Sequence, residues 1–147
     1  MKTLFASLGL LIVVCSASGC SSSGSEGGSQ SSAAPTATST APAPNSKEAL
    51  EARAHQLDVL ASQGDAAAAY EFYSQRCKNI IGNLDAYKAF LTEWLKGRNP
   101  QYGGVTVKVN GSSAQVVSVD NDPNAPASSM QPRTWTFIDG QWQFDNC

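Results

Sequence analysis

The sequence has little of what zinc enzymes, nucleic-acid-binding proteins and membrane-spanning proteins require. Its 147 residues include one histidine, His55, and 10 basic residues against 12 acidic ones. One histidine cannot build a histidine-based zinc site, and phosphate binding needs a cluster of positive charge, which the sequence lacks. No apolar run reaches the roughly 18 residues of a membrane-spanning helix. We therefore expect no metal, no cofactor and no nucleic-acid partner.

The N-terminus has the features of an export signal. Lys2 precedes an apolar run, Leu4 to Val14, that is too short to span a bilayer as a helix. The stretch Ala17-Ser18-Gly19-Cys20 resembles a bacterial lipobox, with Ala17 where that motif usually has Leu. The resemblance implies a signal peptide over residues 1–19 and a lipidated Cys20 that anchors the chain on the extracytoplasmic face of the cell membrane. Ordinary cleavage after small residues, which would release a secreted protein, is the alternative.

Residues 20–46 are predicted to be a linker. After Cys20 they contain no aromatic residue and no Leu, Ile or Val, and Glu26 is their one charged residue. Such a segment cannot bury enough apolar surface to offset the entropy lost on ordering. As a flexible coil it would span about 25–30 Å and hold a domain off the membrane. Its serines and threonines among prolines are candidate sites for O-linked sugars.

Residues 47–147 contain eleven of the twelve aromatic residues and are predicted to form one domain. Its first half shows apolar residues at helical spacing. A first helix should begin at Asn45, which forms a capping-box pattern with Glu48, and should carry Asp58 away from its apolar stripe.

Two more helices are predicted before the strands begin. A second helix should follow Asp65 as one segment and end before Gly82. A third should cover residues 84–95, with one apolar stripe, and end at Gly97.

The second half of the domain predicts two hairpins. Apolar residues alternate with polar ones over residues 105–109, and Asn110-Gly111 is a frequent two-residue turn. That turn would set the pairing of Val109 with Ser112, Val107 with Ala114, and Val105 with Val116.

The second hairpin is predicted around Asp139-Gly140. A two-residue turn there pairs Phe137 with Trp142 and Trp135 with Phe144, which places four aromatic rings on one face. The polar segment 120–132 between the hairpins is expected to be a loop. Helices followed by an antiparallel sheet make the expected fold class α+β, with the N-terminal helices packed on a curved sheet.

The element order, the segment 69–81 (AYEFYSQRCKNII) and the ending 135–147 (WTFIDGQWQFDNC) carry a more specific resemblance. They are similar to the nuclear transport factor 2-like (cystatin-like) domains of actinobacterial lipoproteins of the mycobacterial type. The resemblance implies a cone of helices wrapped by a curved sheet, a fold that hosts enzymes, binders and interaction modules. A pocket in such a cone would be lined by five aromatic residues: Tyr73, Tyr87, Trp94, Trp135 and Trp142.

Cys77 and Cys147 are the two cysteines of the domain, and an oxidising compartment favours their pairing. Strict alternation would put Cys147 on the face opposite Phe144, so we expect the last strand to end by Asp145. Two free thiols are the alternative.

Two polar features are weak candidates for sites. Asp120, Asp122 and Asn124 alternate like the start of a calcium loop, but the glycine at position six and the glutamate at position twelve are missing. We expect a solvated turn there. His55 has no orienting partner nearby in the sequence, so we expect an ordinary helical residue rather than a catalytic base.

The expected function is that of a non-catalytic, membrane-anchored module that binds another envelope protein. Binding of a small apolar ligand or lipid in the cone is the alternative, and an enzyme is the least favoured. A homodimer through the sheet face is a further option. A cavity of about 300 Å³ or more would favour a ligand. An exposed apolar sheet face would favour a protein partner. An unpaired buried carboxylate or arginine would favour an enzyme.

Overall fold

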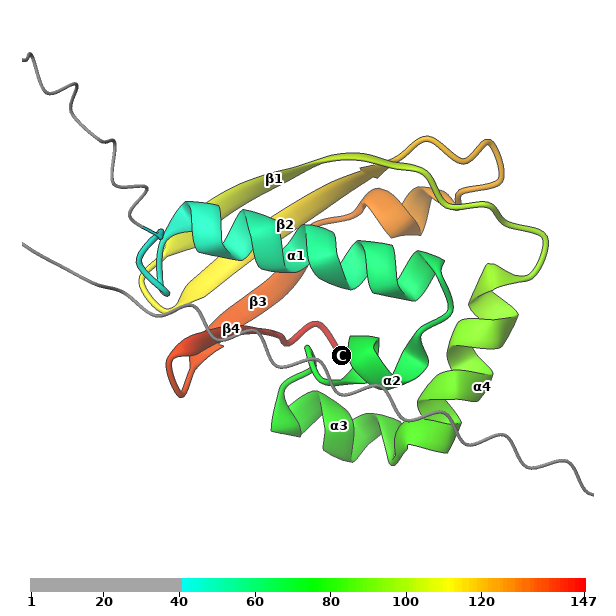
Figure 1. The fold of residues 1–147 in the computed structure, drawn as a ribbon, viewed down its shortest axis with the longest axis horizontal. Coiled ribbons are helices and arrows are strands. Elements are labelled where there is room, and N and C mark those ends of the chain that lie inside the picture. The colour runs from blue at the N-terminus through cyan, green and yellow to red at the C-terminus, as the bar shows by residue number, and fades with distance from the viewer. Residues whose placement is uncertain (1–40) are drawn as a thin grey trace, which may run out of the picture. The chain divides into compact units, whose positions relative to one another are not determined.

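The structure, a computed structural model, describes residues 41–147. The predicted signal peptide, Cys20 and the linker up to residue 40 lie outside these residues. Four helices precede four strands, with one 3₁₀ turn between the hairpins (Figure 1). The elements are α1 (Lys47–Ser62), α2 (Ala66–Tyr70), α3 (Gln75–Ile81), α4 (Leu84–Leu95), β1 (Tyr102–Asn110), β2 (Ser113–Asp120), η1 (Ala127–Met130), β3 (Arg133–Ile138) and β4 (Gln141–Phe144). This order confirms the predicted α+β class.

The sheet is antiparallel, and each strand pairs with the next along the chain in the order β1-β2-β3-β4. The β3–β4 hairpin has the predicted register, with Trp135 opposite Phe144 and Phe137 opposite Trp142. Its turn residues Asp139 and Gly140 both have positive φ, 51° and 82°, as a type I′ turn requires. That turn matches the twist of the strands, which is why the local sequence was sufficient to predict it.

The predicted register of the β1–β2 hairpin is wrong. Val109 lies opposite Ala114 and Val107 opposite Val116, so the turn consists of Gly111 and Ser112. Gly111 has a φ of 60°, the conformation that a turn with glycine at its first central position needs. The observed register places Val107 and Val116, both buried, directly against each other.

Helix α1 begins one residue later than predicted and buries a residue expected outside. Ser46, not Asn45, is the cap, because its Oγ accepts a hydrogen bond from the Ala49 amide at 3.1 Å. Asp58 is buried on the same face as Leu50 and Ala54. It follows Ala54 by four residues, one helical turn, so the helix itself turns it inward.

The single second helix that was predicted is two helices, α2 and α3. In the break between them, the Phe144 amide donates to the Phe72 carbonyl (2.8 Å) and the Ser74 amide donates to the Phe144 carbonyl (2.9 Å). Ser74 then caps α3 by accepting from the Cys77 amide at 3.1 Å. Strand β4 thus supplies the hydrogen bonds that a continuous helix would have made within itself.

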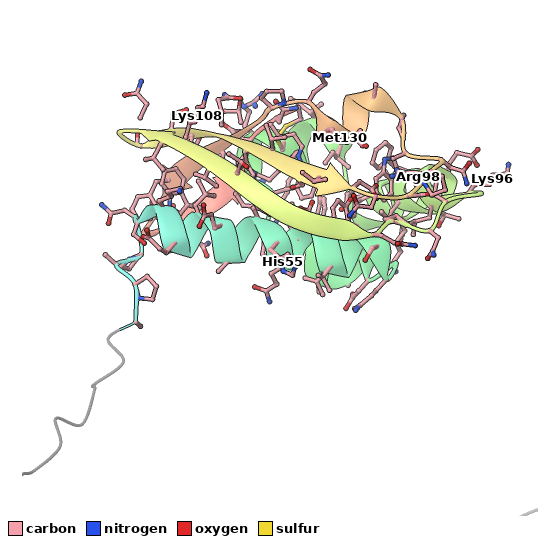
Figure 2. All side chains as sticks on the ribbon, turned by 90° about the horizontal axis from the view of Figure 1, so that it is seen from above. His55, Lys96, Arg98, Lys108 and Met130 are labelled. Atoms are coloured by element: carbon pink, nitrogen blue, oxygen red, sulfur yellow. A yellow bond between two sulfur atoms is a disulfide. The ribbon has the colours of Figure 1, made fainter. Side chains whose placement is uncertain are left out.

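Helix α1 lies across one face of the sheet, and α2 and α4 lie near the C-terminal end of α1 (Figure 1). Helix α3 lies farther from α1, next to the C-terminal residues of the chain. The core fills the space between α1, the short helices and the sheet, and Trp135, Trp142 and Tyr87 are its largest buried side chains. His55 is exposed on the side of α1 that faces away from the sheet (Figure 2). Within residues 41–147, every helix is too short or too polar to cross a bilayer.

Candidate functional site

A cavity of about 390 Å³ opens between α1, α4, η1 and the inner face of the sheet, and we call it the α1–α4 cavity. This volume exceeds the 300 Å³ at which small-molecule sites begin. Thirteen residues line it: Leu57, Asp58, Ala61, Tyr73, Tyr87, Phe90, Leu91, Trp94, Tyr102, Ser128, Ser129, Arg133 and Phe144. Six of the thirteen are aromatic.

The aromatic part of the lining is tightly packed. The ring of Tyr73 lies edge-on to that of Tyr87, with centroids 5.0 Å apart, and 4.8 Å from the ring of Phe144. Phe90, in contrast, is 59% exposed. Such rings present large apolar faces to a ligand, and their fixed packing means that little side-chain entropy is lost when one binds.

Three of the aromatic residues predicted to line a pocket are in this lining: Tyr73, Tyr87 and Trp94. The other two, Trp135 and Trp142, lie in the core instead. Trp135 packs edge-on against Phe144 and Trp142 packs against Phe137, with centroids 5.7 and 5.4 Å apart. Their cross-strand partners therefore cover the surfaces that a ligand would have to reach.

One polar cluster, formed by Asp58, Ser118 and Arg133, lies at the cavity wall. Arg133 Nη2 donates to Asp58 Oδ1 at 3.1 Å and to the Ser118 hydroxyl, which in turn donates to Asp58 Oδ2. The residues come from α1, β2 and β3, so the packing of α1 on the sheet brings them together. Both carboxylate oxygens are therefore occupied.

Burial raises the pKa of the Asp58 carboxyl, and this effect outweighs the opposing influence of Arg133 and Ser118. Burial likewise raises the pKa of the three tyrosines of the lining, Tyr73, Tyr87 and Tyr102. The phenol groups therefore stay neutral at physiological pH. Asp58 and Arg133 are the two remaining ionisable side chains of the lining, and as an ion pair their charges cancel.

A second polar cluster, the Arg98 clasp, is formed by Arg98, Asp120 and Asp122. The turn predicted at 120–124 is present and partly exposed, but the carboxylates of Asp120 and Asp122 are buried, so the prediction that they are solvated is wrong. Arg98 Nη2 contacts Asp120 Oδ2 at 2.5 Å, and its Nε lies 3.5 Å from Asp122 Oδ2. Asp122 also accepts a hydrogen bond from the backbone amide of Asn99, and Asp120 accepts one from that of Gln101. The clasp thus ties the segment before β1 to the end of β2.

The clasp also supports one wall of the cavity. The guanidinium carbon of Arg98 lies 3.9 Å from the ring centroid of Trp94, which is a cation–π contact. Figure 2 shows Arg98 in the segment that follows α4, with Lys96 beside it and pointing outward. Trp94 is therefore held between the clasp and the cavity.

The C-terminus is fastened to α3. Cys77 and Cys147 are joined through a disulfide, and their Cα atoms lie 5.5 Å apart, a separation that is usual for such a bond. Strand β4 ends at Phe144, as predicted, and this frees the last residues to reach α3. Among residues 41–147, the one set of side chains spaced like metal ligands is Cys77, Asp145 and Cys147, and the disulfide occupies both sulfurs.

Asp145 reinforces this connection. Its carboxylate accepts hydrogen bonds from Ser74 (2.5 Å) and from Arg76 (3.0 Å) on the α3 side, and from Thr136 (3.1 Å) on β3. Burial acts to raise the pKa of Asp145, but these hydrogen bonds outweigh it and lower the pKa.

The outward-pointing side chains of the sheet are mostly polar. Thr106, Lys108 and Gln115 are exposed there, and Gln115 donates to Thr134 on the neighbouring strand at 3.0 Å. Val119 is the one large apolar side chain of this face that is among the exposed hydrophobic residues. A face of this composition is typical of a surface in contact with water.

Sequence reasoning missed the Asp58 cluster, although two signals of it were present. Asp58 shares the helical spacing of the buried residues Leu50 and Ala54, and Ser118 continues the inward alternation of Ala114 and Val116. Arg133 has no such signal. Comparisons with protein-family models, with curated proteins and with solved structures find no match for this chain.

Proposed function

We propose that this protein is a membrane-anchored, extracytoplasmic lipoprotein whose domain binds a small, mainly apolar ligand in the α1–α4 cavity. The observation that carries this proposal is the cavity, about 390 Å³ in volume, with a mainly apolar lining and one charge-neutral polar cluster. Sites for small molecules combine an apolar lining with a few placed polar groups. The proposed relationship to nuclear transport factor 2-like domains agrees with a ligand held between helices and sheet.

Two observations favour a ligand over the binding of an envelope protein or a homodimer partner. The outer sheet face is polar, whereas docking through it would call for an apolar patch. The cavity, in contrast, offers a concave surface with six aromatic side chains in its lining. One observation supports the docking of an envelope protein: Ile80 on α3 and Phe90 on α4 are large apolar side chains that are 62% and 59% exposed.

Catalysis has less support than binding. Asp58 is the one carboxylate in the lining, and both its oxygens already accept hydrogen bonds from Arg133 and Ser118. A general base needs a free oxygen within reach of the substrate proton. We therefore propose that the domain binds its ligand without transforming it.

Filling the cavity should abolish binding. Ala61 lies in the lining, and Ala61→Phe would place a ring in the space that a ligand needs. With N-phenyl-1-naphthylamine, a neutral apolar fluorophore, we expect saturable one-to-one binding to the full chain and an affinity at least about tenfold lower for Ala61→Phe. Fluorescence titration measures both.

Ala52→Phe is the matched control, because Ala52 is an exposed residue of the same helix and lies outside the lining. It should bind the fluorophore with unchanged affinity. Absence of saturable binding, or an equal loss in both variants, would contradict the proposed function.

The anchor is tested independently of the ligand. The mature protein, purified from membranes of a bacterial host, should begin at Cys20 and carry at least two acyl chains, since one chain gives only reversible attachment. Intact-mass spectrometry measures this. A soluble product that starts elsewhere would show secretion instead, and would leave the cavity proposal unchanged.

A further inference from the structure

We infer that the ligand of the α1–α4 cavity carries an uncharged hydrogen-bond acceptor, such as the carbonyl oxygen of a ketone, ester or amide, and that Arg133 donates to it. The inference rests on the proposed function and specifies the chemistry that the same site recognises. It follows from two observations: some hydrogen-bond donors of Arg133 have no acceptor among residues 41–147, and the positive charge of Arg133 is already balanced by Asp58.

Arg133 has hydrogen-bond donors that the protein does not use. Its bonds within residues 41–147, to Asp58 and to Ser118, both come from Nη2. Its Nε is buried without a partner, and Nη1 makes no hydrogen bond to these residues. Because the side chain is 20% exposed and lines the cavity, Nη1 is the donor that a ligand can reach. A guanidinium presents its donors in a fixed plane, so the bonds of Nη2 also orient Nη1.

The charge balance disfavours an anionic ligand. The carboxylate of Asp58 already compensates Arg133, and the lining contains no second cation. The Arg98 clasp, which contacts Trp94 of the lining, has one arginine facing two aspartates and so supplies no surplus positive charge. A carboxylate bound at Nη1 would therefore lie near Asp58 with no additional positive charge to offset the repulsion.

A cationic ligand and a pure hydrocarbon fit less well for other reasons. The polar group of a ligand has to lie next to the guanidinium of Arg133, and a cationic group in that position would be repelled by it. A hydrocarbon would cover Nη1 and leave its N–H groups without water or any other partner, which is costly. A neutral acceptor on an apolar body satisfies the donor and adds no charge.

Asp58 and Ser118 have the role of positioning residues in this arrangement. They bind Nη2 from two elements, α1 and β2, and so fix the guanidinium that β3 supplies. Asp58 has a second effect, because its negative charge sets the preference for neutral over anionic ligands. Its removal should therefore change selectivity rather than simply weaken binding.

Three probes with one apolar body test the inference: 2-acetylnaphthalene, 2-isopropylnaphthalene and 2-naphthoate. They differ in the acceptor and in charge but little in shape. In equilibrium dialysis with the full chain we expect the ketone to bind about ten- to a hundredfold more tightly than the hydrocarbon, as for a hydrogen bond from a charged donor. The naphthoate should bind more weakly than the ketone. Equal affinity for ketone and hydrocarbon would overturn the inference.

Two variants separate the roles of Arg133 and Asp58. Arg133→Lys keeps the charge but loses the planar fork, so the advantage of the ketone over the hydrocarbon should shrink about tenfold. Asp58→Asn leaves the guanidinium uncompensated, so the naphthoate should become the preferred probe. A preference for the ketone that persists in both variants would contradict the assignment to Arg133.

The outcomes distinguish this inference from the proposed function. If N-phenyl-1-naphthylamine and all three probes fail to bind the wild-type chain, the proposed function itself is wrong. If they bind without discrimination, the cavity binds ligands but Arg133 does not select them. Circular dichroism verifies that each variant is folded, and the comparison of probes on the wild-type chain does not depend on the variants.

Discussion

Reduction of the Cys77–Cys147 disulfide is expected to lower the free energy of unfolding by about 4 kcal/mol. The bond joins residues 70 positions apart, and a cross-link over such a loop removes many conformations from the unfolded chain. Domains of this size are stable by about 5–15 kcal/mol in total, so a large share of the stability would be lost. The bond also holds the C-terminal residues against α3, beside the contacts of Asp145.

Urea unfolding followed by tryptophan fluorescence, with and without a reductant, measures this loss. The double variant Cys77→Ala/Cys147→Ala should unfold at the midpoint of the reduced wild-type protein and should not respond to reductant. Coincident midpoints for oxidised and reduced wild-type protein would show that the cysteines are not bonded, or that the bond does not constrain the unfolded chain.

Arg98→Met is expected to destabilise the domain by about 3–5 kcal/mol, as for other broken buried ion pairs. The Arg98 side chain is 7% exposed and its partners Asp120 and Asp122 are almost fully buried. Without the guanidinium, two carboxylates would remain buried close to each other with no cation nearby. Trp94 would also lose its cation–π contact.

Lys96→Met is the matched control, since Lys96 lies two residues away and pairs with Glu93 on the surface, where its side chain is 75% exposed (Figure 2). Pairs of this kind contribute about 1 kcal/mol or less. Denaturant unfolding of both variants provides the comparison. A loss for Arg98→Met as small as that for Lys96→Met would mean that the clasp carries little of the stability. A weaker affinity for N-phenyl-1-naphthylamine in Arg98→Met would further link the clasp to the position of Trp94.

The parts of the fold that were predictable are those that short sequences determine. Asp139-Gly140 requires positive φ at two successive residues, which few other dipeptides allow, and the β3–β4 register follows from it. Gly111 also adopts positive φ, but it can be the first or the second residue of a turn, and only packing decides between the two. The break between α2 and α3 depends on hydrogen bonds to β4, which helical spacing does not reveal.

The candidate site was less predictable because its parts are distant in the sequence. Asp58 meets Ser118 and Arg133 across 60 and 75 residues, and Arg98 meets Asp120 across 22. Helical and alternating patterns show which positions face inward, but not that a charge at one of them will find its partner. The aromatic residues of the lining were partly predictable, because Tyr87 and Trp94 share the apolar stripe of α4, whereas Tyr73 lies in the break between α2 and α3.

The pairing of residues 72–74 with β4 has a consequence for self-association. These backbone hydrogen bonds partly close one edge of the sheet to an incoming strand from another molecule. In the described part of the chain, β1 is the strand whose outer edge has no neighbouring strand. The irregular pairing between Tyr102 and Gly104 and the charge of Lys108 discourage intermolecular strand addition there. The two edges of the sheet are thereby protected against aggregation by strand addition, which would matter most at the high local density that the proposed membrane anchor implies.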